Sequence, residues 1–486
     1  MFDHLSCLYI LGRFFSALHL LAVQEGQAET VDHDLKVHTA KTLRLPETVA
    51  DSPSNKFFRN LVREIELQLD AAKEHVSSLL PGGVPTTFNP WLTLKGSLFS
   101  LLDQYRTVLD LQVPFFLLID DFDQLNAEQQ SLFFSAASAR RHDVICYKFG
   151  IMSEGQKAFL AGDGRTYREG DDYNFVRLDW VDGGLETEDK AGNYVKAVEA
   201  IFERRMRISS WPSSMTLSGL LDSWGYGKKL REEAKELALD EYDGLQPSER
   251  PNTFDSYWTK QGNAKYFRLL AKRKISHRYA GRSTVIDLSS GIFRQFLELC
   301  SGIVDLALAD GWSPASGKPI GAEKQNKAIR EWSKDMFRSL GSSGDVSSLG
   351  RKEHVITSEH LINLANSLCR YFQARLLSDS NDPEVIAIAI RDELPNDSFE
   401  KCLLDMAVRE SVLQRRSIDY TSKSGGGERL PTFMLNRRLV PQVGIGTKLQ
   451  GRYEISKSML GIAATDTEQF LKAIRKVSDA NQGSLL

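Results

Sequence analysis

The chain has 486 residues, enough for two to four domains and a substantial core. Its formal net charge of −3 excludes an overall positive potential that would attract nucleic acid to the whole protein. Any basic surface must therefore be local. The five cysteines stand singly, without a C-x-x-C pair or a Cys/His cluster at zinc spacing, which argues against a zinc module and predicts a reducing, cytoplasmic compartment.

The N-terminal segment at 4–23, HLSCLYILGRFFSALHLLAV, is apolar. Asp3 precedes it, Arg13 interrupts it, and no small-residue cleavage site follows. A spanning helix would hold Arg13 near the middle of the bilayer, which is costly. We therefore expect a buried element of a domain, with no membrane contact, rather than a signal peptide or an anchor.

The next part of the chain predicts helices that alternate with strands. Asn126 is a plausible N-cap for one of the helices. The strands are continuous apolar runs, which indicates an α/β layer whose parallel sheet is buried on both faces. The predicted helices are at 56–80, about 92–111 and about 126–140, and the predicted strands at 115–119, 143–151 and 174–180.

Long helical patterns dominate from about residue 187. A Gly/Ser-rich stretch at 341–350 is typical of a flexible linker, and 421–428 is a second break. Short strand-like pieces with Gly-rich turns at 430–456 and a closing helix at about 465–477 suggest a winged-helix module. The predicted helices before them are at about 190–208, 227–240, 254–280, 289–310, 357–378 and 384–415.

Three aspartates follow the strand of the stretch PFFLLIDDFDQL. The carboxyl end of a strand in an α/β sheet opens at the crevice where ligands bind. Asp120 at that point can hold Mg²⁺ through water, and Asp121 can orient or deprotonate an attacking water. Asp123 can help with the metal or cap the next turn. The alternative is a buried strand that ends in an ordinary Asx-type turn.

Several segments resemble one family. FFLLIDDFDQL resembles the Walker B segment (115–121) of AAA+ and STAND P-loop ATPases, especially the origin-recognition (ORC-like) group. SSGIFRQFLELC, at 289–300, is similar to the sensor-2 helix of that group. PTFMLNRRLVPQVGIGTKLQGRY, at 431–453, is similar to the winged-helix ending of bacterial ATPases of this type, and 146–180 to their strands after Walker B. The resemblance covers most of the chain from about 110 onward.

The resemblance implies three domains: an incomplete P-loop α/β domain at 1–186, a helical lid at 187–340 and a winged-helix-like domain at 351–486. It also implies ATP and Mg²⁺ as cofactors. Its site residues are Asp121 and Arg294 for catalysis, Asp120 and Lys148 for the nucleotide, and Asp120 and Asp123 for the metal.

Each further site residue has an alternative interpretation. Arg294 can be an ordinary surface arginine. Lys148 stands at a position where Asn or Thr is more typical of the family. Arg140 and Arg141 can act as an arginine finger in an oligomer, or can simply end a helix in solvent.

The chain lacks the phosphate loop G-x-x-x-x-G-K-[ST], in which glycines let backbone N–H groups cradle phosphate. Gly227-Lys228 is followed by Lys229, and Gly317-Lys318 by Pro319. Both lie after Asp120, which is the wrong order for the family. Our hypothesis is an N-terminally incomplete ATPase that binds nucleotide poorly and hydrolyses little.

The tail predicts a contact with DNA. Arg437, Arg438, Lys448 and Arg452 flank its Gly-rich turn, and a winged helix places basic side chains along phosphates. Charged side chains balanced by nearby acids are the alternative. Self-association and a partner protein both remain open.

Three functions therefore compete. The first is an ORC-like ATP-dependent, DNA-associated regulator. The second is a non-hydrolysing pseudo-ATPase scaffold that binds DNA or protein through its helical and winged-helix parts. The third is a metal-dependent nuclease built on Asp120, Asp121 and Asp123, which lacks the further Glu and Lys that such sites usually need.

Overall fold

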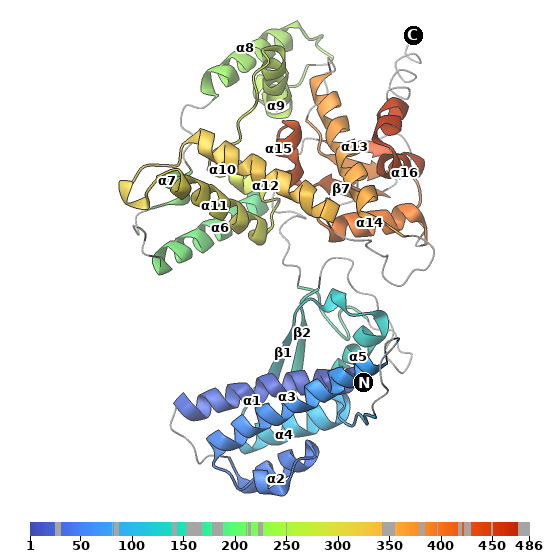
Figure 1. Ribbon diagram of the computed structural model, residues 1–486. Coiled ribbons are helices and arrows are strands. Elements are labelled where there is room, and N and C mark those ends of the chain that lie inside the picture. The colour runs from blue at the N-terminus through green and yellow to red at the C-terminus, as the bar shows by residue number, and fades with distance from the viewer. Residues whose placement is uncertain are drawn as a thin grey trace. The chain divides into compact units, whose positions relative to one another are not determined.

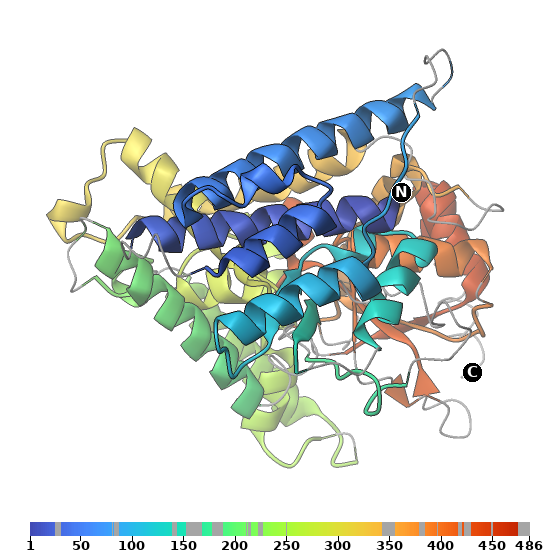
Figure 2. The same cartoon turned by 90° about the horizontal axis from the view of Figure 1, so that it is seen from below.

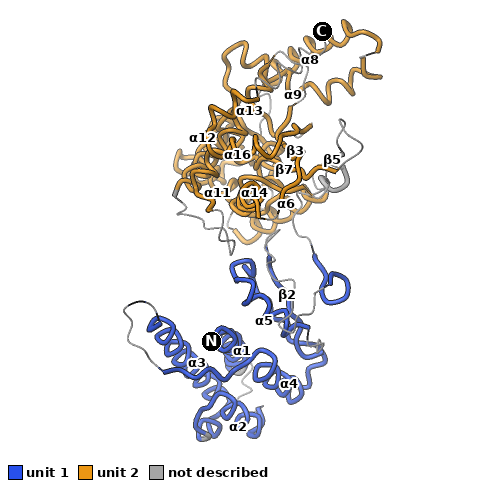
Figure 3. Tube along the Cα trace, turned by 90° about the vertical axis from the view of Figure 1, so that its right-hand side faces the viewer, with its two compact units in different colours: residues 1–176 blue, residues 177–486 orange. Residues whose placement is uncertain are grey.

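The computed structural model divides the chain into two compact units, Met1–Val176 and Arg177–Leu486, which Figure 3 colours separately. The structure describes residues 1–24, 31–79, 81, 87–138, 143–151, 168–176, 188–209, 211, 215–221, 227–248, 250–342, 355–378, 384–395, 397–416, 420–421, 429–448 and 451–474.

Unit 1 combines helices with a two-stranded sheet (Figure 1). The predicted helices and the first two predicted strands are present in its described part. Its elements are α1 (Phe2–Gln24), α2 (His33–Thr42), η1 (Glu47–Val49), α3 (Ser54–Ser78), the π-helical turn η2 (Leu94–Leu98), α4 (Phe99–Val108), β1 (Phe115–Ile119), η3 (Phe122–Gln124), α5 (Ala127–Ala137) and β2 (Ile145–Phe149).

Helices α1 and α3 lie side by side (Figures 1 and 2). The segment Phe2–Leu21 of α1 is long and apolar enough to cross a membrane by length and composition, with a mean hydropathy of 1.3. A core helix passes the same test, and Leu8, Leu11 and Phe15 are fully buried against the rest of unit 1. One side of α1 therefore contributes to a protein core, but only 28 % of the apolar segment is buried, so the prediction of a buried element is confirmed in part, and the membrane evidence is weak.

Strands β1 and β2 pair in parallel, with Phe115 opposite Ile145 and Ile119 opposite Phe149. Because side chains alternate along a strand, the odd-numbered residues of both strands share one face. That face packs on helices: the ring of Phe115 contacts Phe14 of α1 at 5.4 Å, and Phe149 contacts Phe134 of α5 at 5.6 Å.

The opposite face of this sheet is open, which corrects the expectation of burial on both faces. Phe116 is 53 % exposed and Leu118 is 74 % exposed. An apolar strand thus has one covered and one uncovered face. The third predicted strand is not observed over 174–176, and the remainder of its range lies outside the described residues.

Unit 2 is mainly helical and carries a four-stranded sheet of order β4-β7-β3-β8. Its elements are α6 (Glu188–Ile208), α7 (Leu217–Leu220), α8 (Lys228–Gly244), α9 (Phe254–Lys272), α10 (Arg282–Leu288), α11 (Phe293–Ala309), η4 (Pro314–Ser316), α12 (Ala322–Ser342), α13 (Ser358–Leu377), β3 (Ala387–Ile390), α14 (Phe399–Arg409), β4 (Leu413–Arg415), β5 (Tyr420–Thr421), β6 (Arg429–Leu430), β7 (Thr432–Leu435), η5 (Arg437–Leu439), α15 (Val440–Val443), β8 (Tyr453–Ile455) and α16 (Lys457–Thr465).

One hydrophobic core runs through unit 2, from Tyr194 of α6 to Phe470 near the C-terminus. Strand β7 pairs antiparallel with β3 and β4, and the pair β5–β6 extends the hairpin of β4 and β7. Strand β8 pairs in parallel with β3. The predicted strand-like pieces of the tail are β6, β7 and β8, and residues 467–474 are helical as predicted.

The continuous helix predicted at 384–415 is wrong. That range contains β3, α14 and β4. All four residues of β3, Ala387–Ile390, are buried, because other elements cover both faces of the strand. A short run buried on all sides has the same apolar pattern as a buried helix, which explains the error. Most of the predicted linker at 341–350 lies outside the described residues.

Candidate functional site

Asp120 and Gly150 lie beside each other where β1 and β2 end. The backbone N–H of Gly150 donates to the carbonyl of Ile119 at 2.7 Å, and that of Phe122 donates to the carbonyl of Gly150 at 2.9 Å. A Cβ atom on Gly150 would come within 2.4 Å of Asp120 Oδ1. The glycine therefore makes room for the carboxylate. We did not single it out from the sequence, where it lies near the end of the strand predicted at 143–151.

The chain turns sharply directly after Asp120. Asp121 has φ of 52°, in the left-handed region, and its N–H donates to Asp120 Oδ1 at 3.0 Å. Asp121 tolerates this backbone better than most residues do. Both side chains are exposed, so they are accessible to a ligand from solvent.

The rest of the turn is anchored inside unit 1. Phe122 is fully buried, and Gln130 Nε2 donates to its carbonyl at 3.1 Å. Asn126 forms a capping box with Gln129 at the start of α5, which confirms the predicted N-cap. This packing fixes the position of the exposed aspartates, and we call Asp120, Asp121 and Gly150 the acidic corner.

Asp123 departs from its predicted role beside the metal. It is only 4 % exposed, and Gln124 Nε2 donates to its carboxylate at 3.4 Å. Within the described residues, no group of three or more His, Cys, Asp and Glu side chains is arranged to hold a metal ion. The described residues therefore do not provide the three-carboxylate metal site on which the nuclease hypothesis depends. Asp120 remains as a single oxygen ligand, which suits Mg²⁺ because that ion keeps several waters and takes few carboxylates.

Lys148 lies on the open face of the sheet rather than at the acidic corner. Its Nζ stands 5.4 Å from the ring centroid of Phe116, which is four residues before Asp120 on the neighbouring strand. Four residues of strand span about 13 Å. The structure therefore does not bring the ammonium to Asp120.

Arg294 belongs to unit 2, whereas the acidic corner belongs to unit 1. It is the second residue of α11, three residues after Gly291, where Ser290 and Gly291 have positive φ, and its side chain is exposed. This matches the expected position at a helix start. Arg140 and Arg141 lie outside the described residues.

Two of the three arginines predicted to contact DNA, Arg437 and Arg438, lie against other parts of unit 2. Arg437 is 4 % exposed, so its guanidinium cannot reach a phosphate without leaving the core of unit 2. Arg438 stacks 4.5 Å from the ring of Trp332, donates from Nε to the carbonyl of Trp332 at 3.0 Å, and lies 3.4 Å from Glu298. Burial lowers the pKa of both guanidinium groups. Lys448 is exposed and Arg452 is partly buried.

Sequence reasoning missed two carboxylates near Arg437, one buried and one partly buried. Glu384 is 1 % exposed, and Asp287 accepts a hydrogen bond from Thr447 Oγ1 at 3.3 Å. Burial raises the pKa of both carboxyl groups, and the positive charge of Arg437 opposes that rise. No local pattern in the sequence marks these residues, because they come from segments far apart in the chain.

Comparisons with known proteins give one family. A family model described as ORC-CDC6-like matches residues 1–270 and 248–455. No curated protein matches the chain. No solved structure matches it either.

Proposed function

Because the chain belongs to the ORC-CDC6-like family of AAA+ ATPase-type proteins, we propose that it is a DNA-associated regulator whose acidic corner contacts Mg-ATP. The observation that carries the proposal is the exposed Asp120, held against Gly150 at the carboxyl ends of two parallel strands. Ligands of α/β proteins bind at such an edge. The absence of a G-x-x-x-x-G-K-[ST] segment from the sequence favours weak binding and little hydrolysis.

The roles of the two exposed aspartates follow from their positions. Asp120 would hold Mg²⁺, which neutralises phosphate charge when bound. Asp121, turned outward by its left-handed backbone, would orient a water molecule. Arg294 would bind phosphate oxygens, as the family resemblance implies. Self-association or a partner protein would supply the missing contacts to phosphate.

Nucleotide binding can be tested on the full chain with a fluorescent ATP analogue in the presence of Mg²⁺. We expect Asp120→Asn to weaken binding at least about 5-fold, since a charge-assisted contact contributes on the order of 1–3 kcal/mol. Asp51→Asn, which changes an exposed aspartate elsewhere in unit 1, should have no effect. Binding that is unchanged by Asp120→Asn would refute the proposed nucleotide site.

A groove beside the β4–β7 hairpin supports the DNA part of the proposal. Its volume is about 410 Å³, and four of its side chains are basic whereas two, Asp392 and Glu393, are acidic. Arg391 lies 3.4 Å from Glu454, and Lys401 pairs with Asp405, whereas Arg429 is exposed on β6. The basic side chains of the groove are Arg391, Lys401, Arg415 and Arg429.

A salt series of DNA-binding measurements tests this surface. The slope of log K against log salt should fall by roughly 1 for each phosphate contact that is removed. We expect such a fall for Arg429→Ala and for Lys448→Ala. Lys56→Ala, at an exposed lysine in unit 1, should leave the slope unchanged.

The second candidate is a scaffold that binds DNA or protein without nucleotide. The missing phosphate-loop motif and the exposed apolar face of β1 favour it. DNA binding that is indifferent to ATP, together with no measurable nucleotide binding, would establish this candidate over the first. Nucleotide-dependent oligomerisation would establish the first.

A further inference from the structure

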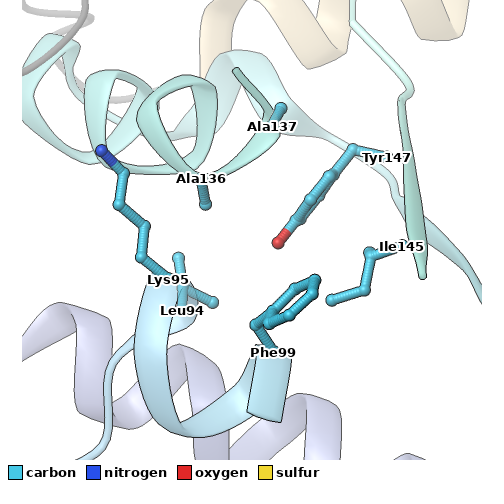
Figure 4. A pocket seen from close by; sticks show the side chains of 7 residues that line it. All are labelled: Leu94, Lys95, Phe99, Ala136, Ala137, Ile145 and Tyr147. Atoms are coloured by element: carbon cyan, nitrogen blue, oxygen red, sulfur yellow. The ribbon is translucent and has the colours of Figure 1, made fainter. Parts of the chain in front are cut away.

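Unit 1 contains a cavity of about 190 Å³ between η2, the C-terminal end of α5 and strand β2 (Figure 4). Five of its seven lining side chains are apolar. An apolar cavity of about 150 Å³ can hold benzene, so this one has room for a single six-membered ring. The apolar lining residues are Leu94, Phe99, Ala136, Ala137 and Ile145.

The hydroxyl of Tyr147 points into this cavity, toward the space between Leu94, Ala136 and Phe99 (Figure 4). It makes no hydrogen bond to any residue that the structure describes. Burial raises the pKa of this phenol, so it keeps its proton and remains a donor. A hydroxyl that faces a cavity without a protein partner can donate to a guest, so the cavity favours a guest that accepts a hydrogen bond.

Lys95 is the one exposed residue among the seven that line the cavity, and its ammonium lies at the far end of the side chain from the Tyr147 hydroxyl (Figure 4). Its ammonium forms no ion pair within the described part of the chain. The nearest acidic influence is Asp3, whose carboxylate already accepts the N–H of Leu94 at 2.7 Å. The Lys95 cation and the Tyr147 donor both favour an anionic group on the guest, whereas the negative charge of Asp3, which also acts on Tyr147, opposes it.

The cavity is separate from the acidic corner. Ile145 and Tyr147 belong to the first half of β2, whereas Gly150 follows its carboxyl end. The three residues from Tyr147 to Gly150 span about 10 Å of strand. The inference about the cavity therefore does not depend on nucleotide binding.

We propose that this cavity binds a small single-ring carboxylate. The ring lies against the apolar walls, and the carboxylate accepts a hydrogen bond from the Tyr147 hydroxyl and faces the Lys95 ammonium. The apolar walls supply most of the affinity, and the two polar groups select an acid over a neutral ring.

Benzoate and toluene form a matched pair of probes, because they share the ring and differ in the carboxylate. Ligand-observed NMR on the full chain should give benzoate a dissociation constant on the order of 1 mM, and toluene one at least about 5-fold weaker. Tyr147→Phe should weaken benzoate about 3- to 10-fold and leave toluene unchanged. Lys95→Gln should weaken benzoate about 2- to 5-fold, an effect that salt reduces, whereas Lys56→Gln should not.

Filling the cavity is the decisive test. Ala136→Phe, or the smaller Ala136→Leu if the first variant loses its native circular dichroism, should abolish binding of both probes. Benzoate binding that survives a folded filled variant would overturn the proposal, since the ligand would then lie elsewhere. Toluene binding as tight as benzoate, or binding of neither probe, would also overturn it.

Discussion

The side chain of Asn263 in α9 donates a hydrogen bond to the carboxylate of Glu384, which lies just before β3. Glu384 is almost fully buried, and burial raises its pKa to about 8. The bond from Asn263 and the charges of Arg437 and Lys448 oppose the rise, whereas Asp287 adds to it. A carboxyl group that holds its proton near neutral pH therefore links α9 to the segment before β3.

Glu384→Gln should change how the stability of unit 2 depends on pH. The ordinary pKa is 4.5, so between pH 4.5 and about 8 the folded state holds a proton that the unfolded state releases. Stability therefore falls as pH rises through this window, by up to about 1.4 kcal/mol for each unit of pKa difference. Glutamine does not titrate, and its side-chain oxygen can still accept the hydrogen bond from Asn263. The fall in stability with rising pH should therefore be smaller in this variant.

Urea midpoints followed by tryptophan fluorescence measure this effect, because six of the seven tryptophans lie in unit 2. Glu393→Gln, at an exposed glutamate nearby, should keep the wild-type dependence. A Glu384→Gln variant with the same pH slope as the wild type would contradict the protonated buried carboxyl.

Gly446→Ala should destabilise unit 2 by roughly 1–3 kcal/mol. A Cβ atom there would come within 2.2 Å of Glu384 Oε1, and the carboxylate is held by Asn263. Gly302→Ala is the matched control, because a Cβ atom on Gly302 meets nothing within 4 Å and alanine favours the α11 helix. Thermal unfolding of the two variants should therefore shift in opposite directions, and equal shifts would show that Glu384 moves aside freely.

Elements with local signals were predictable from the sequence. The strand Phe115–Ile119 and the capping box at Asn126 depend on a few neighbouring residues, so the pattern and the structure agree. The exposure of Phe116 was not predictable, because it depends on which elements cover the sheet. An apolar strand is typical of a sheet interior, and the sequence contains no sign of the open face.

The burial of charged residues in the tail was not predictable from the local sequence either. Arg437 follows β7 in a basic, Gly-rich stretch, which is typical of a surface turn. Its burial depends on Asp287 and Glu384, which are about 150 and 53 residues earlier in the chain. Tertiary packing of this kind overrides local composition, and a single sequence does not reveal it.

His277→Phe should protect unit 2 against mild acid. The imidazole packs 4.5 Å from the ring of Tyr279 and 4.8 Å from that of Phe267. Burial, and then the charges of Arg231 and Arg330, lower its pKa to about 3 from the ordinary 6.5. The unfolded state therefore binds a proton between these pH values that the folded state does not, and stability falls as pH drops below 6.5.

Phenylalanine suits this aromatic site and does not titrate, so the urea midpoint of the variant should change less between about pH 7 and about pH 5. His33→Phe, which replaces an exposed histidine in unit 1, should leave the acid sensitivity of unit 2 unchanged. An unaltered acid sensitivity in His277→Phe would mean that His277 is charged in the folded state.

Leu117→Lys and Leu118→Lys should differ strongly in their effect on stability, although the two residues are adjacent in β1. Leu117 packs on the core of unit 1, so a charge there should cost several kcal/mol, on the order of 3 or more. Leu118 is 74 % exposed, so its change to lysine should alter stability by no more than about 0.5 kcal/mol.

An exposed apolar strand face is also a site of association between chains. Leu118→Lys should therefore lower any concentration-dependent self-association of the full chain in analytical ultracentrifugation. Arg63→Lys, which keeps the charge of a helix residue in unit 1, provides a baseline for the measurement. If Leu118→Lys unfolded unit 1 as Leu117→Lys should, the second face of β1 would be covered in solution, and the open face described here would be wrong.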